Sequence, residues 1–116
     1  MFGINRKKHT HPLLWSIKGI IFVVISIPFI LGIVPPNSLS GFRVAKTISD
    51  EMIWYAANRI MGYDLLVAGV IIIVTGIVTS KIYRGDPTKG NRINRLVFIA
   101  SLLIALAHSF WALDRL

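Results

Sequence analysis

The sequence predicts an all-α membrane protein with three transmembrane helices and an extracytoplasmic interfacial helix between the first and the second. Two observations carry this fold class. Of the 116 residues, 54% are hydrophobic and only 16% are charged, and the mean hydropathy is +0.67. A soluble domain this short could not bury so much apolar surface in one core. The apolar residues also gather in three long runs, and a chain in lipid must pair its backbone groups within a helix or a closed barrel.

The apolar runs set the predicted spans, because crossing the hydrocarbon core takes about 20 residues of helix. Lys18 alone interrupts the first run, which should end at Pro35-Pro36 because proline cannot continue a helix. The second run is short and is extended to Gly62. All spans belong to one domain, 13–116, which follows a basic cytoplasmic tail at 1–12. The predicted spans are about 13–34, 62–82 and 96–113.

Basic residues predict the orientation of these spans. Nine of the 13 lysines and arginines lie before or early in the first span and between the second and third spans, which leaves four for the other side. Cytoplasmic loops carry the excess of basic residues, so the N-terminus is predicted inside and the C-terminus outside. The first group is Arg6, Lys7, Lys8, Lys18, Lys81, Arg84, Lys89, Arg92 and Arg95; the second is Arg43, Lys46, Arg59 and Arg115.

The segment 37–62 between the first two spans is the only one that combines polar, charged and aromatic residues. Thr47 and Asp50 have the spacing of a capping box, which predicts a helix at about 48–61. Trp54 suits the membrane interface, where amphipathic rings lie at headgroup depth. We therefore expect an interfacial helix that leads into the second span.

Arg43 and Arg59 lie in this outer segment among three carboxylates. An arginine near the bilayer can bind a carboxylate through two hydrogen bonds and also hold main-chain carbonyls. We predict that both arginines form a polar cluster with Asp50, Glu51 and Asp64. The alternative is that they face lipid phosphate or a partner protein.

Small residues in the spans recur at helical intervals. Gly62, Gly69 and Gly76 are seven apart, as are Gly19 and Ser26. A seven-residue spacing places each set on one stripe, where neighbouring backbones can approach closely, although small residues are common in membrane helices in any case.

The third span carries a comparable row, in which Ser101 and His108 belong to one face. An ionisable residue in a span is by default a functional candidate. We expect His108 to be a neutral imidazole that donates a hydrogen bond between helices.

The residue types that support catalysis or cofactor binding do not assemble in this sequence. There is no cysteine, and neither a Ser-His-Asp set nor a glycine-rich phosphate loop occurs. His9 and His11 lack a nearby carboxylate that would complete a metal site. We therefore expect no enzyme activity, no cofactor and no metal. The net charge of +8 reflects membrane topology and does not predict nucleic-acid binding.

The outer segment has a characteristic set of residues, namely Asn37, Gly41, Phe42, Arg43, Thr47, Trp54, Asn58, Arg59 and Gly62. This set resembles the signature of the SdpI family, and the similarity covers roughly residues 30–115. Many relatives have Thr-Pro where this chain has Val44-Ala45. The family comprises bacterial and archaeal membrane proteins whose namesake protects a cell from its own secreted peptide toxin, so the resemblance implies a prokaryotic cytoplasmic membrane.

Two classes of function follow. In the first, the protein has an immunity or envelope-protection role and binds a membrane-active peptide through the segment 37–62. Residues expected to be exposed for this contact are Arg43, Asp50, Glu51, Trp54 and Arg59. In the second, it is an accessory structural subunit docked onto a larger membrane protein complex. The expected partners are the lipid bilayer and either such a protein or such a peptide, and the sequence leaves the oligomeric state open.

Overall fold

The computed structural model describes residues 11–37 and 41–116, and all regular secondary structure in that part of the chain is helical. Three of its four helices are long and apolar enough to cross a membrane, which confirms the all-α fold with three potential spans. The helices are α1 (Leu14–Leu31), α2 (Ala45–Ile48), α3 (Glu51–Ile82) and α4 (Pro87–Leu113).

Helix α1 ends earlier than the predicted boundary at residue 34. Gly32 adopts a left-handed conformation with φ of 71° and donates its N–H to the carbonyl of Phe29, at 3.2 Å. The N–H of Ile33 reaches back to the carbonyl of Pro28 in the same way. A left-handed glycine is a common helix C-cap, so the glycine, rather than Pro35-Pro36, terminates α1.

The predicted interfacial helix at 48–61 is not a separate element. Asp50 is the N-cap of α3, because its carboxylate accepts hydrogen bonds from the backbone N–H groups of Met52 and Ile53. From Glu51 the helix continues through Gly62 to Ile82, and the short α2 precedes it. Thr47 and Asp50 therefore cap two different helices rather than forming one capping box.

Helix α4 begins nearer to α3 than the predicted start at residue 96. Asp86 caps it by accepting a hydrogen bond from the N–H of Lys89, and Pro87 occupies a first-turn position where its missing N–H costs nothing. Its polar first turns include Asn91 and Asn94. The turn between α3 and α4 is therefore only residues 83–86.

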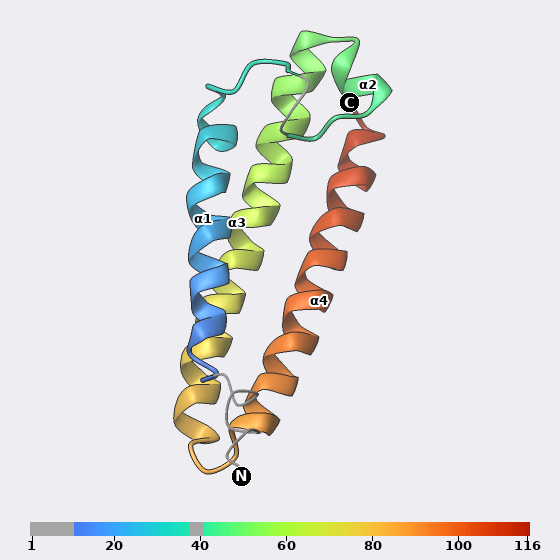
Figure 1. Cartoon of the computed structure of the whole chain (residues 1–116). Helices are drawn as coiled ribbons and strands as arrows, with labels where there is room; N and C mark the ends of the chain where they lie inside the picture. Colours follow the sequence, from blue (N-terminus) through green and yellow to red (C-terminus); the bar gives the residue numbers. More distant parts are fainter. Residues whose placement is uncertain (1–10, 38–40) are drawn as a thin grey trace.

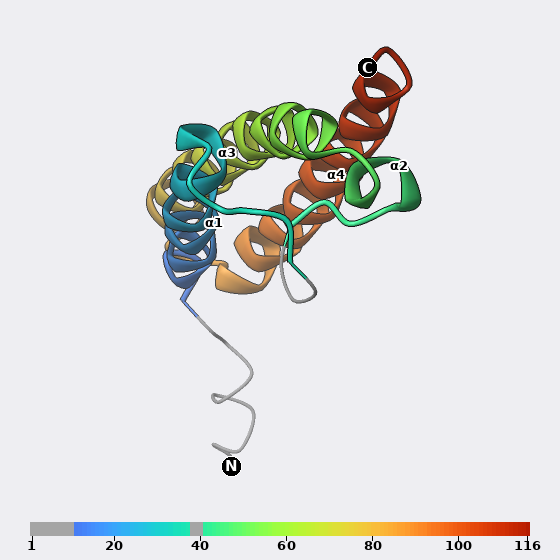
Figure 2. The same ribbon diagram turned by 90° about the horizontal axis from the view of Figure 1, so that it is seen from above.

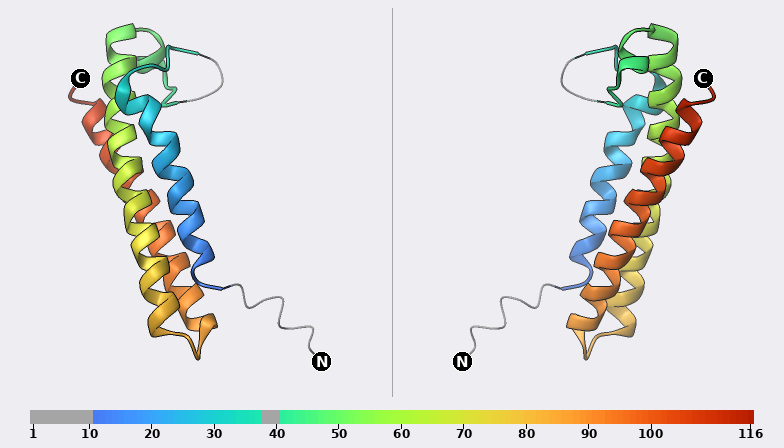
Figure 3. Two further views of the ribbon diagram at one scale, coloured as in Figure 1. Left: turned by 90° about the vertical axis from the view of Figure 1, so that its left-hand side faces the viewer. Right: turned by 90° about the vertical axis from the view of Figure 1, so that its right-hand side faces the viewer.

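The three long helices form an open arc with α3 in the middle, as Figures 1 and 2 show. Helix α1 runs beside α3 along its length, whereas α4 packs on another side of α3 (Figure 3). The described residues between Gly32 and Asp50, which are 32–37 and 41–50, lie at one end of the bundle (Figure 1). We call this segment the cap and the opposite end, with residues 83–86, the turn end.

Helices α1 and α3 meet through small residues. A Cβ atom on Gly19 would lie 2.5 Å from the carbonyl oxygen of Gly69, and one on Gly69 would lie 2.7 Å from that of Gly19. Near the turn end, the Ser16 hydroxyl donates to the carbonyl of Ile73 at 2.8 Å. Only glycine permits the two backbones to approach this closely.

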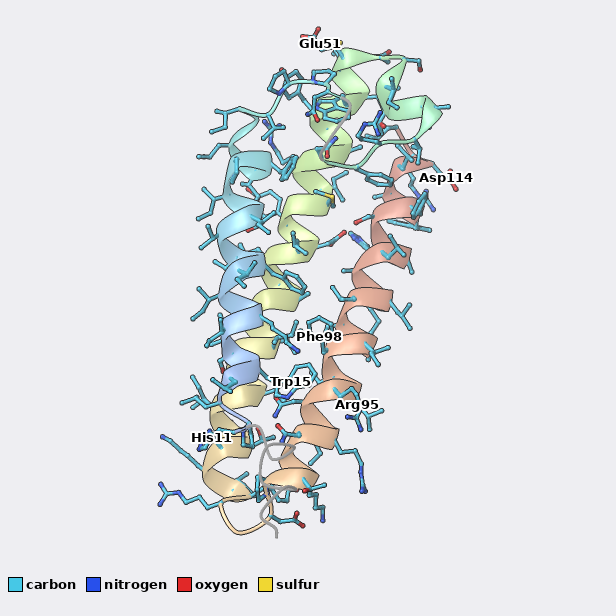
Figure 4. The ribbon with its side chains drawn as sticks, viewed as in Figure 1. His11, Trp15, Glu51, Arg95, Phe98 and Asp114 are labelled. Carbon is cyan, nitrogen blue, oxygen red and sulfur yellow. The ribbon has the colours of Figure 1, made fainter. Side chains whose placement is uncertain are left out.

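Aromatic side chains bring α1 and α4 together towards the turn end. The ring of Phe98 lies 5.5 Å from that of Trp15 and 5.7 Å from that of Phe22, measured between centroids (Figure 4). The Trp15 indole also donates to the side-chain oxygen of Asn91 at 3.2 Å. Lys18 places its ammonium 3.6 Å from the centroid of the Trp15 ring, which gives this basic residue a partner on its own helix.

Candidate functional site

The cap has a buried polar core on α3. Trp54 is completely buried, and its indole N–H donates to the carbonyl of Val34 at 2.9 Å. One turn later, the amide oxygen of buried Asn58 accepts from the N–H of Phe42, while its NH₂ group donates to the carbonyl of Trp54 at 2.9 Å. These bonds satisfy backbone groups of the cap that would otherwise be orphaned away from water.

Gly41 makes the close fit of the cap possible. Its φ is 101°, and a Cβ atom there would lie 2.8 Å from the side-chain oxygen of Asn58 and 3.2 Å from the ring of Trp54. Both the backbone conformation and the lack of space therefore require glycine at this position. The following Phe42 is buried and makes an edge-to-face contact with Phe110 of α4, at 4.9 Å between centroids.

Thr47 holds the cap together from within. Its buried hydroxyl accepts from the N–H of Val44 at 2.9 Å and lies 2.7 Å from the carbonyl of Phe42, to which it donates. The neighbouring Lys46 donates from its ammonium to the carbonyl of Leu113, at 2.9 Å. The cap is thereby joined to the last turn of α4, where a cation is favoured by the helix dipole.

Both outer arginines bind main-chain carbonyls. Arg59 donates from Nε to the carbonyl of Ile30, at 3.1 Å, and so caps the C-terminus of α1. Arg43 donates from Nε to the carbonyl of Asn37, at 2.7 Å. In the described residues neither guanidinium pairs with a carboxylate, so the predicted cluster of arginines and acids is wrong in that respect.

Two of the three acids bind other groups, and the third points away from the bundle, which explains why no arginine pairs with a carboxylate within the described part of the chain. Asp50 caps α3, and Asp64 is held by groups on α4. Glu51 belongs to residues 48–52, where α2 meets α3, and we call this region the apex. Its side chain points away from the bundle (Figure 4).

Asn37 lies beside the prolines and donates its amide to the carbonyl of Pro35, at 2.8 Å.

Burial corrects the expectation that Trp54 is exposed for contact, because this ring forms the floor of the cap. The exposed residues at the apex are instead Asp50 and Glu51 together with two apolar side chains. Ile48 is 50% exposed and Met52 is 83% exposed. The apex therefore presents acidic and apolar groups side by side, with the basic Arg43 of the cap and Arg59 of α3 also exposed.

A second polar cluster joins α3 to α4. The carboxylate of Asp64 accepts from the hydroxyl of Ser109 at 2.7 Å, and both of its oxygens lie 2.8 Å from Nδ1 of His108. The sequence prediction identified His108 but assigned Asp64 to the outer acids. The two residues are 44 positions apart, so no spacing rule links them. Only the apolar sequence around each could have suggested that they need partners.

The small residues of the predicted stripes lie in two places. Gly62, Gly69 and Gly76 are buried against α1, where added Cβ atoms would meet Ser26, Gly19 and Ser16 respectively. Ser101 of α4 has no such role, because its hydroxyl donates to the carbonyl of Val97 in its own helix, at 2.7 Å.

Residues 11–37 and 41–116 contain no group of three His, Asp or Glu side chains that could hold a metal ion. Nδ1 of His11 accepts from the N–H of Leu13, at 3.1 Å, just before α1. His9 lies outside the described residues.

Comparison with known proteins gives one result. The model of the SdpI/YfhL protein family matches residues 33–112, which include the cap from Ile33, all of α2 and α3 and almost all of α4. Helix α1 lies before the matched region. No curated protein and no solved structure matches the chain.

Proposed function

The chain belongs to the SdpI/YfhL protein family, and from this premise we propose that it is a binding protein of the prokaryotic cytoplasmic membrane with a role in immunity or envelope protection. Its three long apolar helices make it a multi-pass membrane protein. The nine-to-four distribution of basic residues supports an orientation with the turn end in the cytoplasm and the cap outside.

The exposed groups of the apex support this proposal most directly. Ile48 and Met52 are exposed next to the carboxylates of Asp50 and Glu51. An apolar patch bordered by acidic groups is complementary to a peptide that is both apolar and cationic. Such a composition is typical of peptides that insert into anionic membranes.

The buried bonds beneath the apex support the same role. Trp54, Asn58 and Thr47 fix the cap on α3, so the exposed groups are presented by a preorganised surface. A surface that is already ordered loses less conformational entropy when a ligand binds. The buried signature residues Trp54, Asn58 and Thr47 therefore support the binding surface from below, whereas the contact itself falls to exposed neighbours.

Survival of cells exposed to a cationic membrane-active peptide tests the proposal. Cells that express the wild-type chain should survive a higher peptide concentration than cells without it. Met52→Lys combined with Glu51→Lys should remove the protection, because it replaces an apolar and an acidic group of the apex by two cations. Asp114→Lys, an exposed charge reversal beyond the end of α4, is the matched control and should retain protection. Equal survival with and without the wild-type chain would refute the proposed role.

The accessory-subunit alternative draws on a different observation. In the 18-residue apolar stretch of each long helix, only 17–28% is buried within the chain. Most of the helical surface is therefore available to lipid or to another membrane protein. Purification in a mild detergent followed by identification of co-purifying proteins separates the two functions. A partner recovered in fixed stoichiometry would favour the subunit role.

A further inference from the structure

A groove of about 380 Å³ lies between α3 and α4, and it is distinct from the cap. Val67 and Ile71 line it on α3, and Ile104 lines it on α4. These walls are apolar and exposed along the helix surfaces. Asp64 and His108 form its polar end, at the side nearer the cap.

The polar end of the groove carries a carboxylate with no basic lysine or arginine partner among the described residues. The Asp64 side chain is 17% exposed, and its bonds come from Ser109 and His108 of α4. Arg59, the nearest arginine on α3 itself, is turned to the carbonyl of Ile30. Arg115 lies over the ring of Trp111, at 4.3 Å from its centroid.

This arrangement creates a site for a cation. The carboxylate of Asp64 lies against apolar walls, where a negative charge is costly. A bound cation that donates hydrogen bonds would offset the cost, and charge-assisted bonds to a carboxylate are the strong ones. His108 is half exposed, and only its Nδ1 is engaged by the described residues.

The dimensions of the groove identify the kind of ligand. It extends along α4 from His108 to Val97, which corresponds to about 16 Å at 1.5 Å per residue. A single alkyl chain suits a groove that is long and apolar.

We propose that this groove binds a single-chain amphiphile with an ammonium head. The head lies at the carboxylate of Asp64, and the alkyl chain lies against Val67, Ile71 and Ile104. Asp64 is five residues beyond Arg59 on α3, about 7.5 Å further from the cap end. The ligand therefore enters sideways from the bilayer leaflet nearer the cap. This binding is independent of the role proposed for the apex.

Photolabelling in lipid nanodiscs tests the proposal. The probes are a photoreactive analogue of dodecylamine and the carboxylic acid and alcohol of the same chain length. The amine should label peptides from the groove about ten-fold more than either other probe, which corresponds to one charge-assisted bond. An excess of dodecylamine, but not of dodecanoate, should prevent this labelling.

Variants assign the effect to the groove. Asp64→Asn should reduce labelling by the amine to the level of the alcohol, whereas Glu51→Gln, the same charge change at the apex, should leave it unchanged. Ala100→Phe, which places a ring in the groove, should lower labelling by all three probes. Equal labelling of the wild type by amine and acid, or equal labelling of the two carboxylate variants, would overturn the proposal. If Asp64→Asn fails to fold, the wild-type competition decides the question alone.

Discussion

The two interfaces of α3 are built in different ways. Against α1, α3 presents glycines, and the carbonyl oxygens of Gly19 and Gly69 come so close that neither residue has room for a Cβ atom. Against α4, the contact depends on polar side chains at two levels. Asn94 donates to the hydroxyl of Thr79 at 2.7 Å near the turn end, and Asp64 is bound from α4 near the cap.

This difference teaches how three long helices can combine a closely packed pair with a more loosely packed one. Lipid removes most of the hydrophobic driving force between helices, so association depends on close packing or on interhelical hydrogen bonds. Close packing of backbones fixes α1 on α3 over their length. Two separate polar contacts leave space between them, and the groove occupies part of that space. We expect the two interfaces to respond differently to substitution.

The largest expected effect is at the glycine contact. Gly19→Leu should lower the free energy of unfolding by about 3 kcal/mol, because the added side chain forces two backbones apart. Reversible unfolding in mixed micelles measures this change. Gly85→Leu is the control, since a Cβ atom there meets nothing within 4 Å. Equal stability of the two variants would show that α1 and α3 are not closely packed.

The next effect concerns the attachment of α1 to α3 at the cap. Trp54→Phe removes the donor to the carbonyl of Val34 and leaves a small cavity in a fully buried site. The expected loss is about 2 kcal/mol in unfolding free energy. Trp111→Phe, which alters an exposed ring on α4, should cost much less in the same measurement. A similar loss for both would mean that the indole bond adds nothing.

A smaller loss of stability is expected when a hydrogen bond between α3 and α4 is removed, compared with one inside α4. Ser109→Ala removes a donor to Asp64 of the neighbouring helix, and should cost about 1 kcal/mol. Ser101→Ala removes a hydroxyl that bonds only within α4, and should change stability by less than about 0.5 kcal/mol. Thermal unfolding of both variants in the same detergent provides the comparison. The reverse order would contradict an interhelical role for Asp64.

The smallest effect is expected where the cap meets α4. Lys46→Met should cost about 0.5 kcal/mol by releasing the carbonyl of Leu113. Faster amide hydrogen exchange in the last turn of α4, with the rest of the helix unchanged, is the appropriate measurement. Arg92→Met removes an exposed cation from the other end of α4 and should leave that turn unaffected. Unchanged exchange in both variants would show that Lys46 does not stabilise the turn.

The sequence predicted the number of potential spans because a long apolar run is a strong local signal. It also separated Gly62, Gly69 and Gly76 as one stripe. It could not predict which residue of α1 faces each glycine, since the register between helices depends on packing over the whole interface. Local helix propensity also could not predict that α3 continues through Gly62. This glycine lies against Ile30 of α1, where a Cβ atom would have no room.

The candidate sites were less accessible to prediction for a related reason. Trp54 has the composition and position of an interfacial aromatic residue, and only the folded cap reveals that it is buried. Asp64 stands at the edge of an apolar run, so its sequence context favoured the outer acids. Its actual partners come from α4, and their placement depends on how α3 and α4 cross. Residues identified by a family signature can thus support a surface that others present.

The length of α3 has a mechanical consequence. Its 32 residues extend over about 48 Å, whereas the hydrocarbon core of a bilayer is about 30 Å thick. The helix therefore projects beyond the core, and the site where its backbone comes closest to that of α1, at Gly69, is near its midpoint. If α3 were tilted about that point, its two ends at Glu51 and Ile82 would move in opposite directions.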